Sequence, residues 1–398
     1  MDNITHSLVG IAVADCLSRG GETKTGRRLS VGAAIVAANL PDIDLAYVGI
    51  APAPLGYLLH HRGHTHTVVG VVLLLVMLVS IYRFLPPIRQ LPAGDRVRLW
   101  LSIAIALGSH VPLDALNSYG VHPFYPVDSS WYFGDAVFIF EPGLWIVLGI
   151  AAAWNARTRT ARLVSALPIV IFPITMVSTG IIPIEAAAFF AIMGGFSAWA
   201  AGRMARRARA GAALTACAVM IVALVLTSWL ARREAIDTLR PELHGRLVDV
   251  ILLSNPSSPL CWAVIGIDLD EAGGEYILWR GTLSLAPGWK APTACASHRF
   301  AAVPAMRTMG QGRLALRDEI HQPLRQLRRL ADGDCRVRAW LRFGRAPVVA
   351  GGSIFDLRFA ERATQNFTHM PLHPDDNASG CPPYLPRWGM PRADLLSR

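Results

Sequence analysis

The chain has 398 residues, of which 53% are hydrophobic and 17% are charged, and its formal net charge is +10. Because soluble domains carry about 25% charged residues, this composition excludes an ordinary soluble protein and indicates a membrane protein. The basic residues are mostly arginines in loops and in the C-terminal part, without interleaved aromatic residues. We therefore expect the lipid bilayer, and no nucleic acid, as a partner.

Eight apolar segments in residues 1–231 predict membrane helices, since a spanning helix needs about 20 mostly apolar residues. Pro41 interrupts the second segment, and proline breaks or kinks a helix. The predicted fold class is therefore mainly α, a polytopic helical membrane bundle. In chain order the segments are Ile4–Leu17, Leu29–Ile50, Thr67–Phe84, Leu99–Leu116, Val137–Trp154, Leu163–Pro183, Ile184–Ala201 and Ala212–Leu230.

Residues 232–398 are densely charged and predict a soluble C-terminal α+β domain with a flexible, proline-rich end. Residues Ala315–Leu330 have helical spacing. Four segments have the length and residue types of strands: Leu260–Ile267, Tyr276–Leu285, Val337–Phe343 and Ile354–Phe359.

The cysteines of this domain number four, and an even number permits two disulfides in an oxidising compartment. Three pairings are possible and the sequence does not choose between them; four free thiols are the alternative. Cys16 and Cys217 lie in apolar helices and are expected to pack there. The four are Cys261, Cys295, Cys335 and Cys381.

Basic loops predict the orientation, because arginine and lysine favour cytoplasmic loops. Every second loop is basic, so the segments Ala51–His66 and Asn117–Asp135 and the C-terminal domain are expected on the outer, periplasmic side of an inner membrane. The basic residues are Arg19, Lys24, Arg27 and Arg28, then Arg89, Arg96 and Arg98, then Arg157, Arg159 and Arg162, and finally Arg203, Arg206, Arg207 and Arg209.

Histidines and aspartates gather on that outer side. Four histidines occur between His60 and His66, and His110 precedes Asp114 by four residues, which places the two on one helix face. Ionisable groups at membrane depth are usually functional. Imidazole with carboxylate suits zinc, and also manganese or iron. We therefore predict a divalent metal site; a histidine-rich loop and ordinary polar residues of a bundle are the alternatives.

A bound metal would lower the pKa of water and polarise a scissile group, which favours hydrolysis. Arg62 lies within the histidine cluster and has the fork geometry that binds an oxyanion. Its alternative role is that of an anchor among lipid headgroups.

Several motifs in order resemble the LexA-regulated, membrane-bound metal-dependent hydrolase family over about residues 1–145. They are Thr5-His6, Pro41-Asp42-Ile43-Asp44, His61-Arg62-Gly63 with Thr65-His66, and His110-x3-Asp114-x2-Asn117-x-Tyr119-Gly120, followed by Gly134-Asp135 and Glu141-Pro142. The chain departs from the family pattern at Thr67, where serine is usual, and at Glu141, where aspartate is usual. His60 and His64 fall outside the pattern.

The resemblance implies the all-helical fold of zinc-dependent phospholipase C and single-strand nucleases. It implies the metal ligands His6, Asp42, Asp44, His61, His66, His110 and Asp114. We assign catalytic roles to Arg62, Asn117 and Asp135.

The predicted function is hydrolysis of a phosphoester, as a small-molecule or lipid-linked substrate, by metal-activated water. The alternative is a transport or channel protein with a His/Asp ion pathway. A pathway would distribute these residues across the membrane depth, often with repeat symmetry, whereas here they gather on one side and no repeat is evident.

Overall fold

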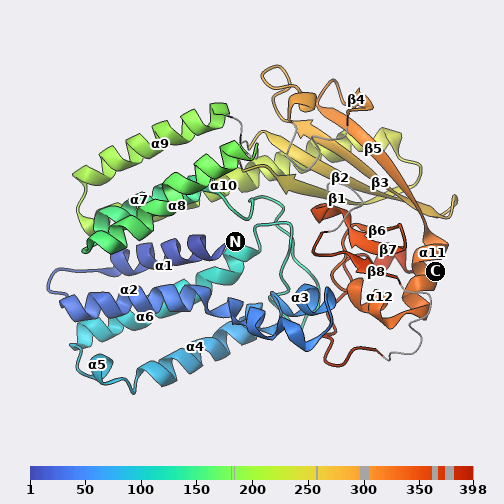
Figure 1. Ribbon diagram of the computed structural model, residues 1–398. Helices are drawn as coiled ribbons and strands as arrows, with labels where there is room; N and C mark the ends of the chain where they lie inside the picture. The colour runs from blue at the N-terminus through green and yellow to red at the C-terminus, as the bar shows by residue number, and fades with distance from the viewer. Residues whose placement is uncertain are drawn as a thin grey trace. The chain divides into compact units, whose positions relative to one another are not determined.

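The computed structural model describes residues 1–180, 182, 184–256, 259–295, 304–360, 366–372 and 381–397 (Figure 1). The chain forms two compact units, each built from three stretches. The helical unit consists of Met1–Ile43, Thr65–Asn117 and Val137–Val225. The sheet unit consists of Asp44–His64, Ser118–Ala136 and Leu226–Arg398. The domain boundary predicted at residue 231 stays a prediction.

Helices occupy all eight of the segments predicted to be membrane helices. They are α1 (Asn3–Leu17), α2 (Lys24–Asn39), α4 (Val68–Tyr82), α6 (Ala93–Asp114), α7 (Pro142–Asn155), α8 (Arg159–Ser178), α9 (Ile184–Arg203) and α10 (Arg206–Leu239). Shorter helical turns lie between and after them: η1 (Leu40–Ile50), α3 (Leu55–His60), η2 (His64–His66), α5 (Pro86–Arg89) and η3 (Arg240–Glu242).

Three helical stretches of the described chain are long and apolar enough to cross a membrane: Lys24–Ile50, Arg159–Ser178 and Arg206–Glu242. A fourth is possible if Leu55–His66 and Val68–Tyr82, which are bent by 65°, make one span. Helices α1 and α7 are apolar but shorter. The structure thus supports a membrane protein, and eight crossings stay a prediction.

Small side chains let the helices of the helical unit approach closely, as is common between membrane helices. Helix α2 buries Ala34 and Ala37 completely, and α6 buries Leu99 and Ile103 completely, in one core. A Cβ atom at Gly10 of α1 would lie 2.8 Å from the carbonyl oxygen of Ala34. Helices α1, α2 and α6 therefore pack as one group, and α7 packs against α1, α8 and α9 (Figure 1).

The sheet unit contains a five-stranded antiparallel sheet in the order β1-β2-β3-β5-β4. A second sheet has the order β6-β7-β8. The strands are β1 (Arg246–Ser254), β2 (Cys261–Asp270), β3 (Glu275–Ser284), β4 (Arg307–Met309), β5 (Leu314–Pro323), β6 (Pro347–Ala350), β7 (Ser353–Asp356) and β8 (Met370–Pro371). The helical elements are η4 (Pro292–Ala294), α11 (Leu324–Gly333), α12 (Cys335–Trp340), η5 (Leu357–Phe359) and η7 (Ala393–Leu395).

Two of the predicted elements here were wrong. The helix predicted over Ala315–Leu330 is strand β5 followed by helix α11, because the first half pairs with β3 and β4 and this pairing overrides the local spacing. The strand predicted over Val337–Phe343 is largely helix α12, whose N-terminus the Asp334 carboxylate caps by accepting a hydrogen bond from the Arg336 amide.

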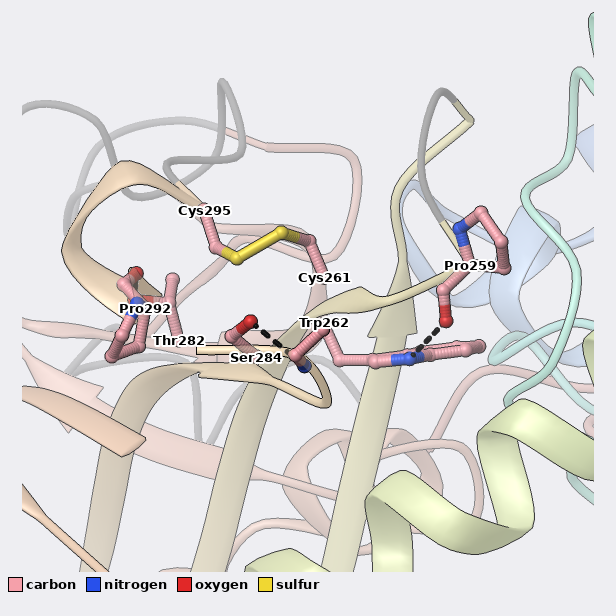
Figure 2. The surroundings of a disulfide bond; sticks show 8 residues. Pro259, Cys261, Trp262, Thr282, Ser284, Pro292 and Cys295 are labelled. Atoms are coloured by element: carbon pink, nitrogen blue, oxygen red, sulfur yellow. Dashed lines mark hydrogen bonds between the residues drawn. A yellow bond between two sulfur atoms is a disulfide. The ribbon is translucent and has the colours of Figure 1, made fainter. Parts of the chain in front are cut away.

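Two disulfides join the four cysteines of this region: Cys261 with Cys295, and Cys335 with Cys381. Figure 2 shows the first, at the start of β2, where the neighbouring indole of Trp262 donates a hydrogen bond to the Pro259 carbonyl at 2.8 Å. The predicted flexible end lies partly outside the described residues.

Candidate metal centre

Four side chains of the helical unit place ligand atoms close enough together to hold a metal ion. His110 and Asp114 lie on the last turns of α6, Asp42 lies in η1 after the α2 helix, and His66 ends η2. One ligand atom from each lies within 4.8 Å of all the others. His66, His110 and Asp114 are buried, and Asp42 is half-buried.

The spacing of these atoms matches a tetrahedral coordination sphere. Zinc bonds of about 2.0–2.1 Å put neighbouring ligand atoms about 3.3 Å apart. The Nε2 atoms of His66 and His110 are 3.1 Å apart. Asp42 Oδ1 lies 3.4 and 3.6 Å from these two nitrogens, and Asp114 Oδ2 lies 3.3 and 3.5 Å from them. The donor set of two imidazoles and two carboxylates therefore fits a divalent metal.

The protonation of His110 supports the same conclusion. Its Nδ1 lies 2.6 Å from the carbonyl oxygen of Ala38, and because a carbonyl only accepts, this nitrogen carries the proton. In the neutral ring the lone pair is then on Nε2, which lies 3.1 Å from Nε2 of His66. Metal-binding histidines are usually held through the other ring nitrogen in this way. The Nδ1 of His66 lies 3.1 Å from the Thr65 hydroxyl.

His6 of α1 contacts two members of this cluster, Asp114 and His110. Its Nε2 lies 3.3 Å from Asp114 Oδ1, and its ring stacks on that of His110 with centroids 3.9 Å apart. The start of α1 is fixed because Thr5 donates to Asp2 at 2.6 Å and accepts from the Trp145 indole at 2.8 Å. The structure therefore brings five of the seven predicted ligands together.

The other two predicted ligands lie in the sheet unit and pair with each other. His61 Nδ1 is 3.1 Å from Asp44 Oδ1, and the Asp44 carboxylate is buried. The ring of His61 also contacts Tyr57 and Tyr119, with centroids 5.1 and 5.7 Å away. A carboxylate that holds an imidazole in this manner fixes the orientation of the ring.

Arg62, a predicted catalytic residue, is also in the sheet unit. Its side chain is 2% exposed, and its guanidinium lies over the Tyr119 ring, 4.9 Å from the centroid. Its backbone has φ 57°, a conformation that a non-glycine residue adopts infrequently.

Asp135, the second predicted catalytic residue, makes ion pairs. Its carboxylate lies 2.5 Å from Arg232 and 2.9 Å from Arg345, and Arg345 also pairs with Asp249 at 2.7 Å. Burial raises the pKa of Asp249, but the charges of Arg345 and the neighbouring arginines outweigh it and hold that pKa below its usual range. These ion pairs hold Asp135 in a buried network, and its assigned catalytic role stays a prediction. Sequence reasoning missed Arg345, since no local signal connects residues so far apart.

Asn117, the third predicted catalytic residue, is buried in the helical unit three positions after Asp114. In the sheet unit, the rings of His64 and His122 lie 4.8 and 3.9 Å from that of Trp388. These histidines are placed for aromatic packing.

Comparisons with known proteins match the N-terminal part of the chain. The family model for the YdjM inner membrane protein matches residues 1–182. The inner membrane protein YbcI of Escherichia coli is 32% identical over 157 residues, which are 39% of this chain and 80% of YbcI. The YfhP protein of Bacillus subtilis is 28% identical over 162 residues, 39% of this chain and 47% of YfhP, so the match spans about half of that relative. No solved structure matches the chain significantly. By its N-terminal half, which carries the His/Asp cluster, the chain belongs to the YdjM family of inner membrane proteins.

Proposed function

We propose that this protein is a membrane-bound, metal-dependent hydrolase. The observation that carries the proposal is the convergence of Asp42, His66, His110 and Asp114, with ligand spacings of 3.1–3.6 Å. Zinc is the metal that we favour for this donor set, and manganese and iron are the alternatives. The motifs also resemble a family that is regulated by LexA and that has the fold of phospholipase C and single-strand nucleases. This regulation and this fold stay expectations.

Each of the two units contributes its own chemical groups to this proposal. Asp42, His66, His110 and Asp114 would hold the metal, and His6 supports Asp114. When bound, a divalent ion supplies a Lewis acid and lowers the pKa of water. Within the sheet unit, Asp44 orients the His61 imidazole, which can hold or pass a proton. Arg62 supplies a guanidinium that suits the oxyanion of a phosphoester, free or lipid-linked.

The position of the cluster supports action at the periplasmic side. Within the helical unit, His110 and Asp114 lie at the end of α6, whereas Arg98 lies near its start. Basic residues favour the cytoplasmic end of a helix bundle. The two disulfides support the same side for the C-terminal region, because disulfides persist in oxidising compartments.

An ion pathway is less well supported. Between the two ends of α2 and α6, the buried side chains include the apolar Ala34, Ile103 and Ala106 and the neutral hydroxyls of Ser30 and Ser102. A continuous pathway would place ionisable groups along this depth.

The proposal is tested with the purified protein and simple phosphomonoester and phosphodiester substrates. Chelation should abolish turnover and zinc should restore it, while His110→Ala should remain inactive after zinc is added. Metal-free protein with undiminished turnover would refute the proposal, as would a His110→Ala variant with wild-type turnover.

A further inference from the structure

A groove of about 640 Å³ opens at the end of the helical unit opposite to the metal cluster. Helices α1, α2, α7 and α8 line it. Lys24 and Arg28 lie on the first turns of α2, and Arg157 lies just before α8. All three side chains are exposed. Further along the same helices, the lining becomes apolar with Val31 of α2 and Val164 of α8. The groove is therefore basic at one end and apolar along its length.

The positive charge of this groove is largely uncompensated. Its only acidic lining residue, Asp15, is already neutralised by Arg27, whose Nη2 donates to Asp15 Oδ1 at 3.0 Å. Lys24, Arg28 and Arg157 make no ion pair within the described part of the chain.

Two helix N-termini add to this potential. Helix α2 begins at Lys24 and is capped by Thr23, and α8 begins at Arg159 and is capped by Thr158. Thr158 itself lines the groove. The N-terminal end of a helix carries a partial positive charge and favours phosphate groups.

We propose that this groove binds an anionic phospholipid. Its phosphate would lie among Lys24, Arg28 and Arg157, and its acyl chains would lie along Val31 and Val164. A free phosphate would satisfy only the basic end, whereas a lipid matches both the charge and the apolar wall. Basic pockets between membrane helices on the cytoplasmic side are suited to anionic headgroups.

The test is native mass spectrometry of the detergent-solubilised full chain, titrated separately with phosphatidylglycerol, phosphatidylcholine and inorganic phosphate. The triple variant Lys24→Gln, Arg28→Gln and Arg157→Gln should bind phosphatidylglycerol on the order of 100-fold more weakly. A matched control, Arg83→Gln, Arg89→Gln and Arg96→Gln, removes the same charge from exposed positions outside the groove lining. The control should bind as the wild type does.

Three outcomes would overturn the proposal: equal binding of phosphatidylcholine and phosphatidylglycerol to the wild type, unchanged affinity in the triple variant, or displacement of the lipid by inorganic phosphate. Size-exclusion chromatography and thermal melting report whether the triple variant is folded. If it is not, the single variant Arg157→Gln takes its place, with an expected loss of several-fold, and unchanged affinity there counts against the proposal.

Discussion

Replacing Asp114 by asparagine tests the metal centre with the smallest change in shape. The substitution removes one negative charge from a side chain whose oxygens lie 3.3 Å from His6, 3.3 Å from His66 and 3.5 Å from His110. Loss of a residue that merely supports a ligand lowers metal affinity about 10–100-fold. We propose Asp114 as a ligand in its own right, so we expect a loss of at least about 100-fold, or about 3 kcal/mol.

The assay measures zinc in the purified protein after equilibration with chelators of graded affinity. The matched control is Asp15→Asn, because Asp15 is as buried as Asp114, at 1% exposure, but lies at the other end of the helical unit. This control should keep its zinc. An Asp114→Asn variant that retains zinc as the wild type does would refute the assignment. Equal losses in both variants would attribute the effect to unfolding instead.

Three further predictions concern other parts of the chain. Because the folded-state pKa of Asp249 is lowered, its ion pairs stabilise the protein above the unfolded-state pKa of about 4; thermal melting of the full chain should therefore show stability falling as the pH drops below about 4, and an Asp249→Asn variant should lose this part of the acid dependence. Single cysteines at Ala53 and Val127 should react with an impermeant reagent from the periplasm, and one at Gly94 should not; reaction of all three from one side would overturn the predicted topology. Arg62→Lys should keep the metal and lower turnover by about 1–3 kcal/mol in activation free energy, with Arg62→Ala worse; full activity in both would remove Arg62 from the proposed chemistry.

The helices and part of the metal cluster could be predicted because their signals are local. Apolar runs gave the positions of eight helices, and the four-residue spacing of His110 and Asp114 placed both on one face of α6. The different partners of Asp42 and Asp44 could not be predicted. Asp42 lies near His66, and Asp44 pairs with His61; both histidines lie beyond η1, and the spacing of the two aspartates alone does not identify them.

Contacts between segments that are far apart in the sequence could not be predicted. Asp135 follows a glycine in a motif that resembles a hydrolase family, and nothing near it in sequence reveals Arg345 as its partner. The same holds for β5, whose helical spacing gave way to pairing with β3. In both cases the deciding contact is made with a distant segment that local patterns do not identify.

The distribution of polar groups along α1 and α6 connects the predicted orientation with the proposed chemistry. Helix α1 has His6 at one end, and α6 has His110 at the corresponding end. At their other ends, each helix has an aspartate that pairs with an arginine: Asp15 in α1 and Asp95 in α6. A buried charge is tolerated only with a partner, and at one end an arginine supplies it. At the other end, Asp114 faces the N-terminal ammonium of Met1 as well as His6, His66 and His110, and Asp42 faces His66 and His110. A divalent cation held by this cluster would join the ends of α1, α2 and α6, so metal binding and the stability of the helix packing should be coupled.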